Sequence, residues 1–169
     1  MKPCGRSPSF VWPGTTLQKV NPNFKELLLE FNAHDVEYLM VGAHALAAHG
    51  HIRATKDLDI WVRPEKANAQ KVLQALSDFG APLMDLSVDD LSRKKTIFQI
   101  GLAPIRIDVV TSIDGVEFAE AWPDRLGIVY AGVPAFVISR HHLITNKKAS
   151  GRLQDLADVQ ELESIDNPT

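Results

Sequence analysis

Three aspartates in this chain have the spacing that could hold a divalent metal ion. Asp57 and Asp59 lie at positions i and i+2 of a short apolar segment. Because alternate residues of a β-strand point to the same side, the two carboxylates would project together. Adjacent carboxylates raise each other's pKa unless a positive charge lies between them, and Mg²⁺ commonly binds one or two carboxylates with substrate phosphates. The pair predicts a site for Mg²⁺ or Mn²⁺; the alternative is a solvated strand edge.

A third acid, Asp108, lies in a second strand-like segment, from Ile105 to Val110, among β-branched residues. Arg106 lies two places before it and on the same side of the strand. A lone buried acid without a partner is costly. If the two strands are neighbours, three carboxylates converge on one point, which makes a good metal site and a poor structural element.

The segment before the acid pair has features that suit phosphate binding. An apolar run, Val36 to Val41, predicts a buried strand, and Gly42-Ala43 predicts a turn into a helix of small residues. The N-terminus of that helix would present free N–H groups and a positive dipole end, which suit a phosphate. His44 could touch a phosphate or base, and Arg53 could bind phosphate or neutralise the acids.

This arrangement resembles the polymerase-β-type nucleotidyltransferase superfamily. That family's signature is Gly-Gly or Gly-Ser after a strand, Asp-x-Asp or Asp-x-Glu after roughly ten residues, and a third acid on a later strand. Here thirteen residues separate Ala43 from Asp57, and Ala43 stands where Gly or Ser is usual. The form Arg53-x-Thr55-x-Asp57 resembles the small bacterial branch, which includes nucleotidyltransferase-like toxins of abortive-infection systems and uncharacterised stand-alone proteins. The resemblance covers about residues 24–112 and a C-terminal piece.

The resemblance implies a role for each motif residue. Asp57, Asp59 and Asp108 would hold one or two Mg²⁺ ions, and Asp108 would help to deprotonate the acceptor. The C-terminal stretch from Lys148 to Asp158 resembles a tail whose Lys and Arg lie near the active-site cleft. The alternative for this stretch is helix-end solvation with an Arg152–Asp155 pair at i, i+3. The implied nucleotide-binding residues are Gly42, Ala43, His44, Arg53, Lys148 and Arg152.

The implied activity is transfer of a nucleotidyl group from a nucleoside triphosphate (NTP) to a hydroxyl or phosphate of an unknown acceptor, with loss of pyrophosphate. The acceptor could be RNA, a protein or a small molecule such as an antibiotic, and the protein could act in a toxin–antitoxin or phage-defence system. The alternative is a catalytically weak or inactive binding or regulatory module, antitoxin-like, with a protein partner. An RNA acceptor would need a basic patch. The candidates for that patch are Arg93, Lys94, Lys95, Arg140, Lys147, Lys148 and Arg152.

The composition limits which of these functions and locations the chain can have. The net charge of −3 gives no global basic field to attract nucleic acid. The single cysteine, Cys4, excludes an internal disulfide and fits a reducing compartment. No apolar stretch reaches the roughly 18–20 residues that span a bilayer, and the N-terminal apolar segment is too short for a signal peptide. We therefore expect a cytoplasmic protein without a membrane association; a homodimer stays open.

The predicted fold class is α+β, a nucleotidyltransferase-like mixed sheet of four to six strands with helices packed mainly on one face and a C-terminal helical pair. Residues 1–22 are expected to be an irregular leader whose apolar residues attach it to the body or to a second subunit. Residues 23–138 are expected to form the core, and residues 139–169 a C-terminal helical segment packed on it. Thr96–Ile100 and Ile105–Thr111 predict an antiparallel hairpin.

Overall fold

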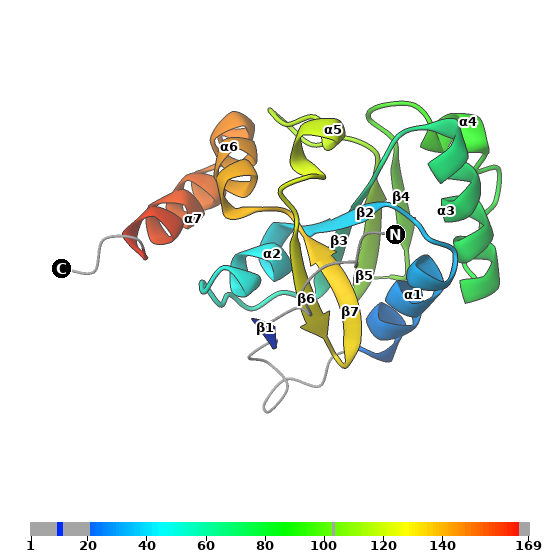
Figure 1. Cartoon of the computed structure of the whole chain (residues 1–169), viewed down its shortest axis with the longest axis horizontal. Helices are drawn as coiled ribbons and strands as arrows, with labels where there is room; N and C mark the ends of the chain where they lie inside the picture. The colour runs from blue at the N-terminus through cyan, green and yellow to red at the C-terminus, as the bar shows by residue number, and fades with distance from the viewer. Residues whose placement is uncertain (1–9, 12–20, 103, 166–169) are drawn as a thin grey trace, which may run out of the picture.

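A mixed seven-stranded sheet forms the centre of the computed structural model, which describes residues 10–11, 21–102 and 104–165 (Figure 1). The strands are β1 (Phe10–Val11), β2 (Tyr38–Val41), β3 (Asp57–Val62), β4 (Ile97–Ile100), β5 (Arg106–Val110), β6 (Leu126–Tyr130) and β7 (Val133–Val137). The helices are α1 (Pro22–Ala33), α2 (Gly42–Ala48), α3 (Lys66–Phe79), α4 (Val88–Leu91), α5 (Phe118–Ala121), α6 (Arg140–Ser150) and α7 (Leu153–Ser164).

The strand order is β1-β6-β7-β2-β3-β5-β4. The α+β fold class is confirmed, with one strand more than predicted. The extra strand is β1, which pairs in parallel with β6 through Phe10 and Ile128. A strand of two residues is too short to show an alternating pattern in a proline-rich segment, so sequence patterning does not predict it. The remaining leader residues up to 20, with Trp12 and Leu17, lie outside the described part.

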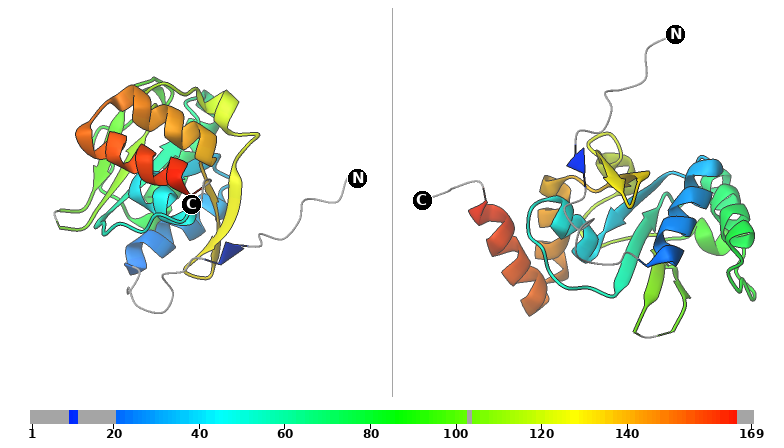
Figure 2. Two further views of the ribbon diagram at one scale, coloured as in Figure 1. Left: turned by 90° about the vertical axis from the view of Figure 1, so that its left-hand side faces the viewer. Right: turned by 90° about the horizontal axis from the view of Figure 1, so that it is seen from below.

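Helices α1 and α3 lie side by side and cover one face of the sheet (Figure 2). Helix α1 begins where the side chain of Asn21 accepts the backbone N–H of Asn23 at 2.9 Å. Its apolar stripe is buried throughout and consists of Phe24, Leu27, Leu28 and Phe31. This layer fixes the strands whose opposite face carries the acids.

Strand β3 is held between β2, antiparallel to it, and β5, parallel to it. Leu58, Ile60 and Val62 alternate with the acids and are fully buried. Because side chains alternate along a strand, this burial determines which face Asp57 and Asp59 occupy. The hairpin of β4 and β5 is antiparallel, as predicted, and supplies Asp108.

Helices α6 and α7 form the predicted C-terminal pair at one end of the molecule, and they run side by side in both figures. Ser139 caps α6 by accepting the backbone N–H of His142, and Gly151 ends it with φ 66°. Within the described ranges, no helix is both long and apolar enough to cross a membrane.

Candidate active site

The sheet register brings the three acids to one surface. Asp59 pairs with Asp108 across the parallel strands β3 and β5, and Asp57 pairs with Arg106. Paired residues point to the same face, and so do residues two apart on one strand. The two acid-bearing strands are therefore neighbours, which was the condition for the acids to share one face.

A cation lies among these carboxylates. The Arg106 guanidinium is 3.5 Å from Asp57 and 3.0 Å from Asp108. Because Arg106 precedes Asp108 by two residues, the sequence places it on the same strand face. Its contact with Asp57 depends on the pairing of β3 with β5. Arg106 neutralises one of the three negative charges and leaves an excess of two, which matches the charge of one divalent ion.

Burial and mutual repulsion perturb two of the acids. Burial, together with the nearby carboxylates of Asp108 and Asp57, raises the pKa of Asp59 to about 6, against the opposing charges of Arg106 and Lys147. Burial also raises the pKa of Asp108, against the opposing charge of Arg106, while Asp57 adds to the rise. A bound cation would stabilise the ionised form of carboxylates whose pKa is raised in this way.

Gly42 leaves the space that the Asp59 carboxylate fills. Its φ is +65°, and a Cβ at this position would overlap Oδ2 of Asp59. Helix α2 begins directly at Gly42, without the separate Gly42-Ala43 turn that the sequence predicted. A glycine is therefore required here by both its backbone conformation and the adjacent acid.

A cleft of about 400 Å³ opens beside this point. Gly42 and Asp59 form one side of it, and Lys147, Arg152 and Asp155 from the C-terminal pair form another. The cleft therefore lies between an acidic sheet surface and a helical pair that carries cations. A triphosphate chelated to a divalent ion needs both kinds of charge.

Lys147, rather than the predicted Lys148, faces this cleft. Lys147 is 3% exposed and its Nζ donates to Asp155 and Asp158, each at 2.8 Å. Lys148 points outward, half-exposed, and pairs with Glu163 at 2.7 Å. Leu143, four residues before Lys147, is fully buried. The sequence does not distinguish the two lysines by spacing, because Ile144 lies four residues before Lys148 just as Leu143 lies four before Lys147.

The remaining predicted residues lie around the cleft rather than in it. Arg53 reaches Asp158 at 3.4 Å, so it ties the connector before β3 to α7. His44 is buried, with its ring edge-on to Phe24 and Tyr130. Burial lowers the pKa of His44 to about 4, despite a hydrogen bond with the backbone of Asp57, so the ring is neutral near pH 7. It thus brings no charge to a phosphate.

The lysine pair allows a direct test of this placement. Lys147→Met should lower the free energy of unfolding by about 3 kcal/mol, because it leaves Asp155 and Asp158 buried with one partner fewer. Lys148→Met should change it by less than about 0.5 kcal/mol, since its ion pair is exposed. Urea denaturation of both variants measures the difference. Equal effects would contradict the assignment of Lys147 to the buried position.

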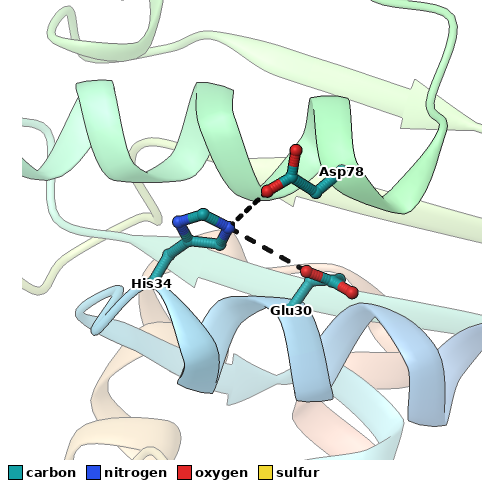
Figure 3. Close-up of side chains that lie close together, drawn as sticks. All are labelled: Glu30, His34 and Asp78. Atoms are coloured by element: carbon teal, nitrogen blue, oxygen red, sulfur yellow. Dashed lines mark hydrogen bonds and ion pairs between the residues drawn. The ribbon is translucent and has the colours of Figure 1, made fainter.

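A second group of ionisable side chains lies between α1 and α3, away from the cleft (Figure 3). His34 Nε2 is 2.7 Å from Asp78 and 3.9 Å from Glu30. Within the described residues, this is the one set of three potential ligand atoms that all lie within 4.8 Å of one another. Asp78 also accepts from Gln74 at 3.0 Å. The contacts of His34 join helix α1 to helix α3. On the sheet, by contrast, Arg106 lies in contact with both Asp57 and Asp108.

Comparison with known proteins finds a matching family model. Residues 15–167 match the profile of a family described as nucleotidyltransferase of unknown function (DUF6036). No curated protein matches.

Solved structures share the fold. The lincosamide antibiotic adenylyltransferase LnuA, bound to lincomycin, is 16% identical, with a TM-score of 0.54 over 88% of this chain and 99% of that one. A Thermotoga maritima protein classed as a nucleotidyltransferase is 12% identical, with a TM-score of 0.54 over 90% and 98%. The antibiotic-resistance factor ANT(2'')-Ia is 15% identical, with a TM-score of 0.56 over 83% and 80%. At these identities the likeness concerns the fold.

Proposed function

Because this chain belongs to the family of nucleotidyltransferases of unknown function, we propose that it transfers a nucleoside monophosphate from an NTP to an acceptor and releases pyrophosphate. The observation that carries the proposal is the meeting of Asp57, Asp59 and Asp108 on one sheet face beside Gly42. A purely structural role does not explain three acids on one sheet face, two of them with raised pKa values.

The residues present fit a divalent ion. Oxygen ligands from Asp57, Asp59 and Asp108 are the kind that Mg²⁺ and Mn²⁺ prefer, and the excess of two negative charges after Arg106 is counted would be neutralised. A bound ion would supply charge stabilisation for the transferring phosphoryl group.

The chain's own side chains would divide the remaining work. Arg152, which lines the cleft and is exposed, would bind phosphate oxygens, and Lys147 would hold Asp155 and Asp158 in place beside it. Asp108 would accept the proton of the acceptor hydroxyl. The acceptor oxygen then forms a bond to the α-phosphorus, the bond from that phosphorus to the bridging oxygen breaks, and pyrophosphate leaves with the bonding electrons. No covalent intermediate with the protein is required.

The fold relatives suggest a kind of acceptor. LnuA was solved with lincomycin, and ANT(2'')-Ia was solved with adenylyl-2''-tobramycin, so the latter holds a nucleotidyl group on a small molecule. By analogy we extend the proposal to acceptors with a hydroxyl group. The competing function, a regulatory module without catalysis, would keep the fold while Arg106 satisfied the acids permanently.

Thermal melting separates the two functions. With Mg²⁺ and an NTP each present at about 100 times the dissociation constant, we expect stabilisation of about 2.7 kcal/mol, because a ligand of the native state shifts unfolding by mass action. For a chain of this length that is a rise in Tm of roughly 5–10 °C. Either ligand alone should give a smaller rise, and pyrophosphate should be released when a suitable acceptor is added. No rise with any NTP and metal together would favour the regulatory module.

A further inference from the structure

We propose that a second pocket beside the cleft is the acceptor subsite, and that it takes an uncharged ring compound bearing several hydroxyl groups. The pocket has a volume of about 350 Å³, which suits a small molecule. Trp61, Thr111, Val116 and Phe118 contribute to its walls. This inference rests on the proposed nucleotidyl transfer.

The pocket lies on the same surface as the acids. Trp61 follows Asp59 by two residues on β3, so both side chains point to the same face, roughly 7 Å apart along the strand. The pocket also shares part of its wall with the cleft. The shared residues are Lys95, Ser112, Ile113 and Asp114. A molecule seated against Trp61 is therefore close enough to present a hydroxyl to a phosphate held beside Asp59.

The wall residue Trp61 has an indole N–H that lacks a hydrogen-bond acceptor among the described residues. Trp61 is 1% exposed, and its Nε1 has no partner among the described residues. The ring meets Phe118 edge-on, with centroids 4.9 Å apart. A buried donor without an acceptor is unfavourable, so an oxygen of a bound molecule that reaches Nε1 after a small shift of the ring would gain a hydrogen bond there.

The rim carries equal numbers of opposite charges, already paired in part. Arg63 donates to Glu37 and to Glu65, and it lies 4.9 Å from the ring centroid of Phe118. Lys94 donates to both carboxylate oxygens of Glu117 at 2.7 Å. The cations Arg63, Lys94 and Lys95 are matched in number by the acids Glu65, Asp114 and Glu117. The rim thus offers donors and acceptors without a net charge.

Hydroxyl groups match this rim best, because each one both donates and accepts. Carboxylates can accept from them, and the indole, guanidinium and ammonium groups can donate to them. A polyanion such as RNA would instead need cations without carboxylate partners. Three of the basic residues suggested for an RNA surface, Lys94, Lys147 and Lys148, are bound to acids.

The test fills the pocket from its exposed side. Ala119 lines the pocket and is exposed on α5, and Glu120 is its exposed neighbour outside the lining. Ala119→Trp places a large ring in the pocket, and Glu120→Trp is the matched control. Saturation-transfer NMR is recorded with myo-inositol, with methyl α-glucoside and with a 3′-hydroxyl RNA dodecamer as probes, each in the presence of Mg²⁺ and a non-hydrolysable NTP analogue whose binding is measured separately by calorimetry.

We expect signals from the two polyols with the wild type and with Glu120→Trp, reduced at least tenfold in Ala119→Trp, while binding of the NTP analogue is the same in all three. No polyol signal with the wild type, despite analogue binding, would overturn the acceptor assignment alone. Loss of analogue binding in Ala119→Trp would show that the pocket binds the base of the NTP and not the acceptor. An RNA signal that is present in the wild type and lost in that variant would show that the acceptor is RNA and not a polyol. If the wild type binds no analogue, the proposed function fails first.

Discussion

Replacing Asp59 by Asn is expected to reduce nucleotidyl transfer by about a thousandfold or more. Asp59 lies at the centre of the acidic surface, opposite Asp108 and next to Gly42. The loss of one metal-binding carboxylate removes several kcal/mol of transition-state charge stabilisation, and about 4 kcal/mol corresponds to a thousandfold in rate. Single-turnover kinetics with saturating NTP measures the effect. A rate within tenfold of the wild type would exclude metal-assisted transfer at this residue.

The same variant should be more stable than the wild type when metal is absent. Burial and the neighbouring acids raise the pKa of Asp59 from 3.8 to about 6. A raised carboxyl pKa favours the protonated folded state, so the contribution of this group to stability is lost as the pH rises from about 4 through about 6. In EDTA, Asp59→Asn should therefore gain about 1–2 kcal/mol relative to the wild type at pH 8 and nothing at pH 4. This control separates lost chemistry from a lost fold.

Gly42→Ala is expected to impair both stability and activity. Its φ of +65° strains any residue with a Cβ, by about 1–2 kcal/mol. The added methyl group would also overlap Oδ2 of Asp59 and push that carboxylate out of place. A displacement of about 1 Å in a catalytic group can lower a rate a hundredfold, so a loss of about that size is expected in kcat. Urea denaturation and steady-state kinetics measure the two effects.

Gly132→Ala is the matched control for that variant. Gly132 has a φ of +82° with no other atom within 4 Å of the added Cβ, so it reports backbone strain alone. We expect it to lose about 1 kcal/mol of stability and no activity. If Gly42→Ala matched this control in both measurements, the contact between Gly42 and Asp59 would have no catalytic importance.

The sequence predicted the parts of the site that depend on strand periodicity. Asp57, Asp59 and Asp108 could be assigned to one face because alternate residues share a side and the intervening Leu58 and Ile60 are apolar. The cost of a lone buried acid favoured a shared site for Asp108 and the acid pair, whereas the pairing of β3 with β5 is shown by the sheet register. These features depend on the pattern within one strand or on the pairing of two strands.

Features that depend on packing between distant segments escaped prediction. The choice between Lys147 and Lys148 depends on how α6 rotates against α7, and the pairing with Asp158 fixes it. The place of Arg106 between two acids depends on the register of two strands. The unpaired N–H of Trp61 depends on how the side chains of distant segments, Phe118 among them, pack around the ring. None of these is encoded in the spacing of one segment.

Asp57, Asp59 and Asp108 are proposed to bind an NTP through a divalent ion. Isothermal calorimetry of the protein with each of the four NTPs, with and without Mg²⁺, tests this claim most directly, beside the double variant Asp57→Asn, Asp59→Asn. We predict binding of at least one NTP that depends on Mg²⁺ and is lost in the double variant. Binding that is equally strong without metal, or in the double variant, would contradict the claim.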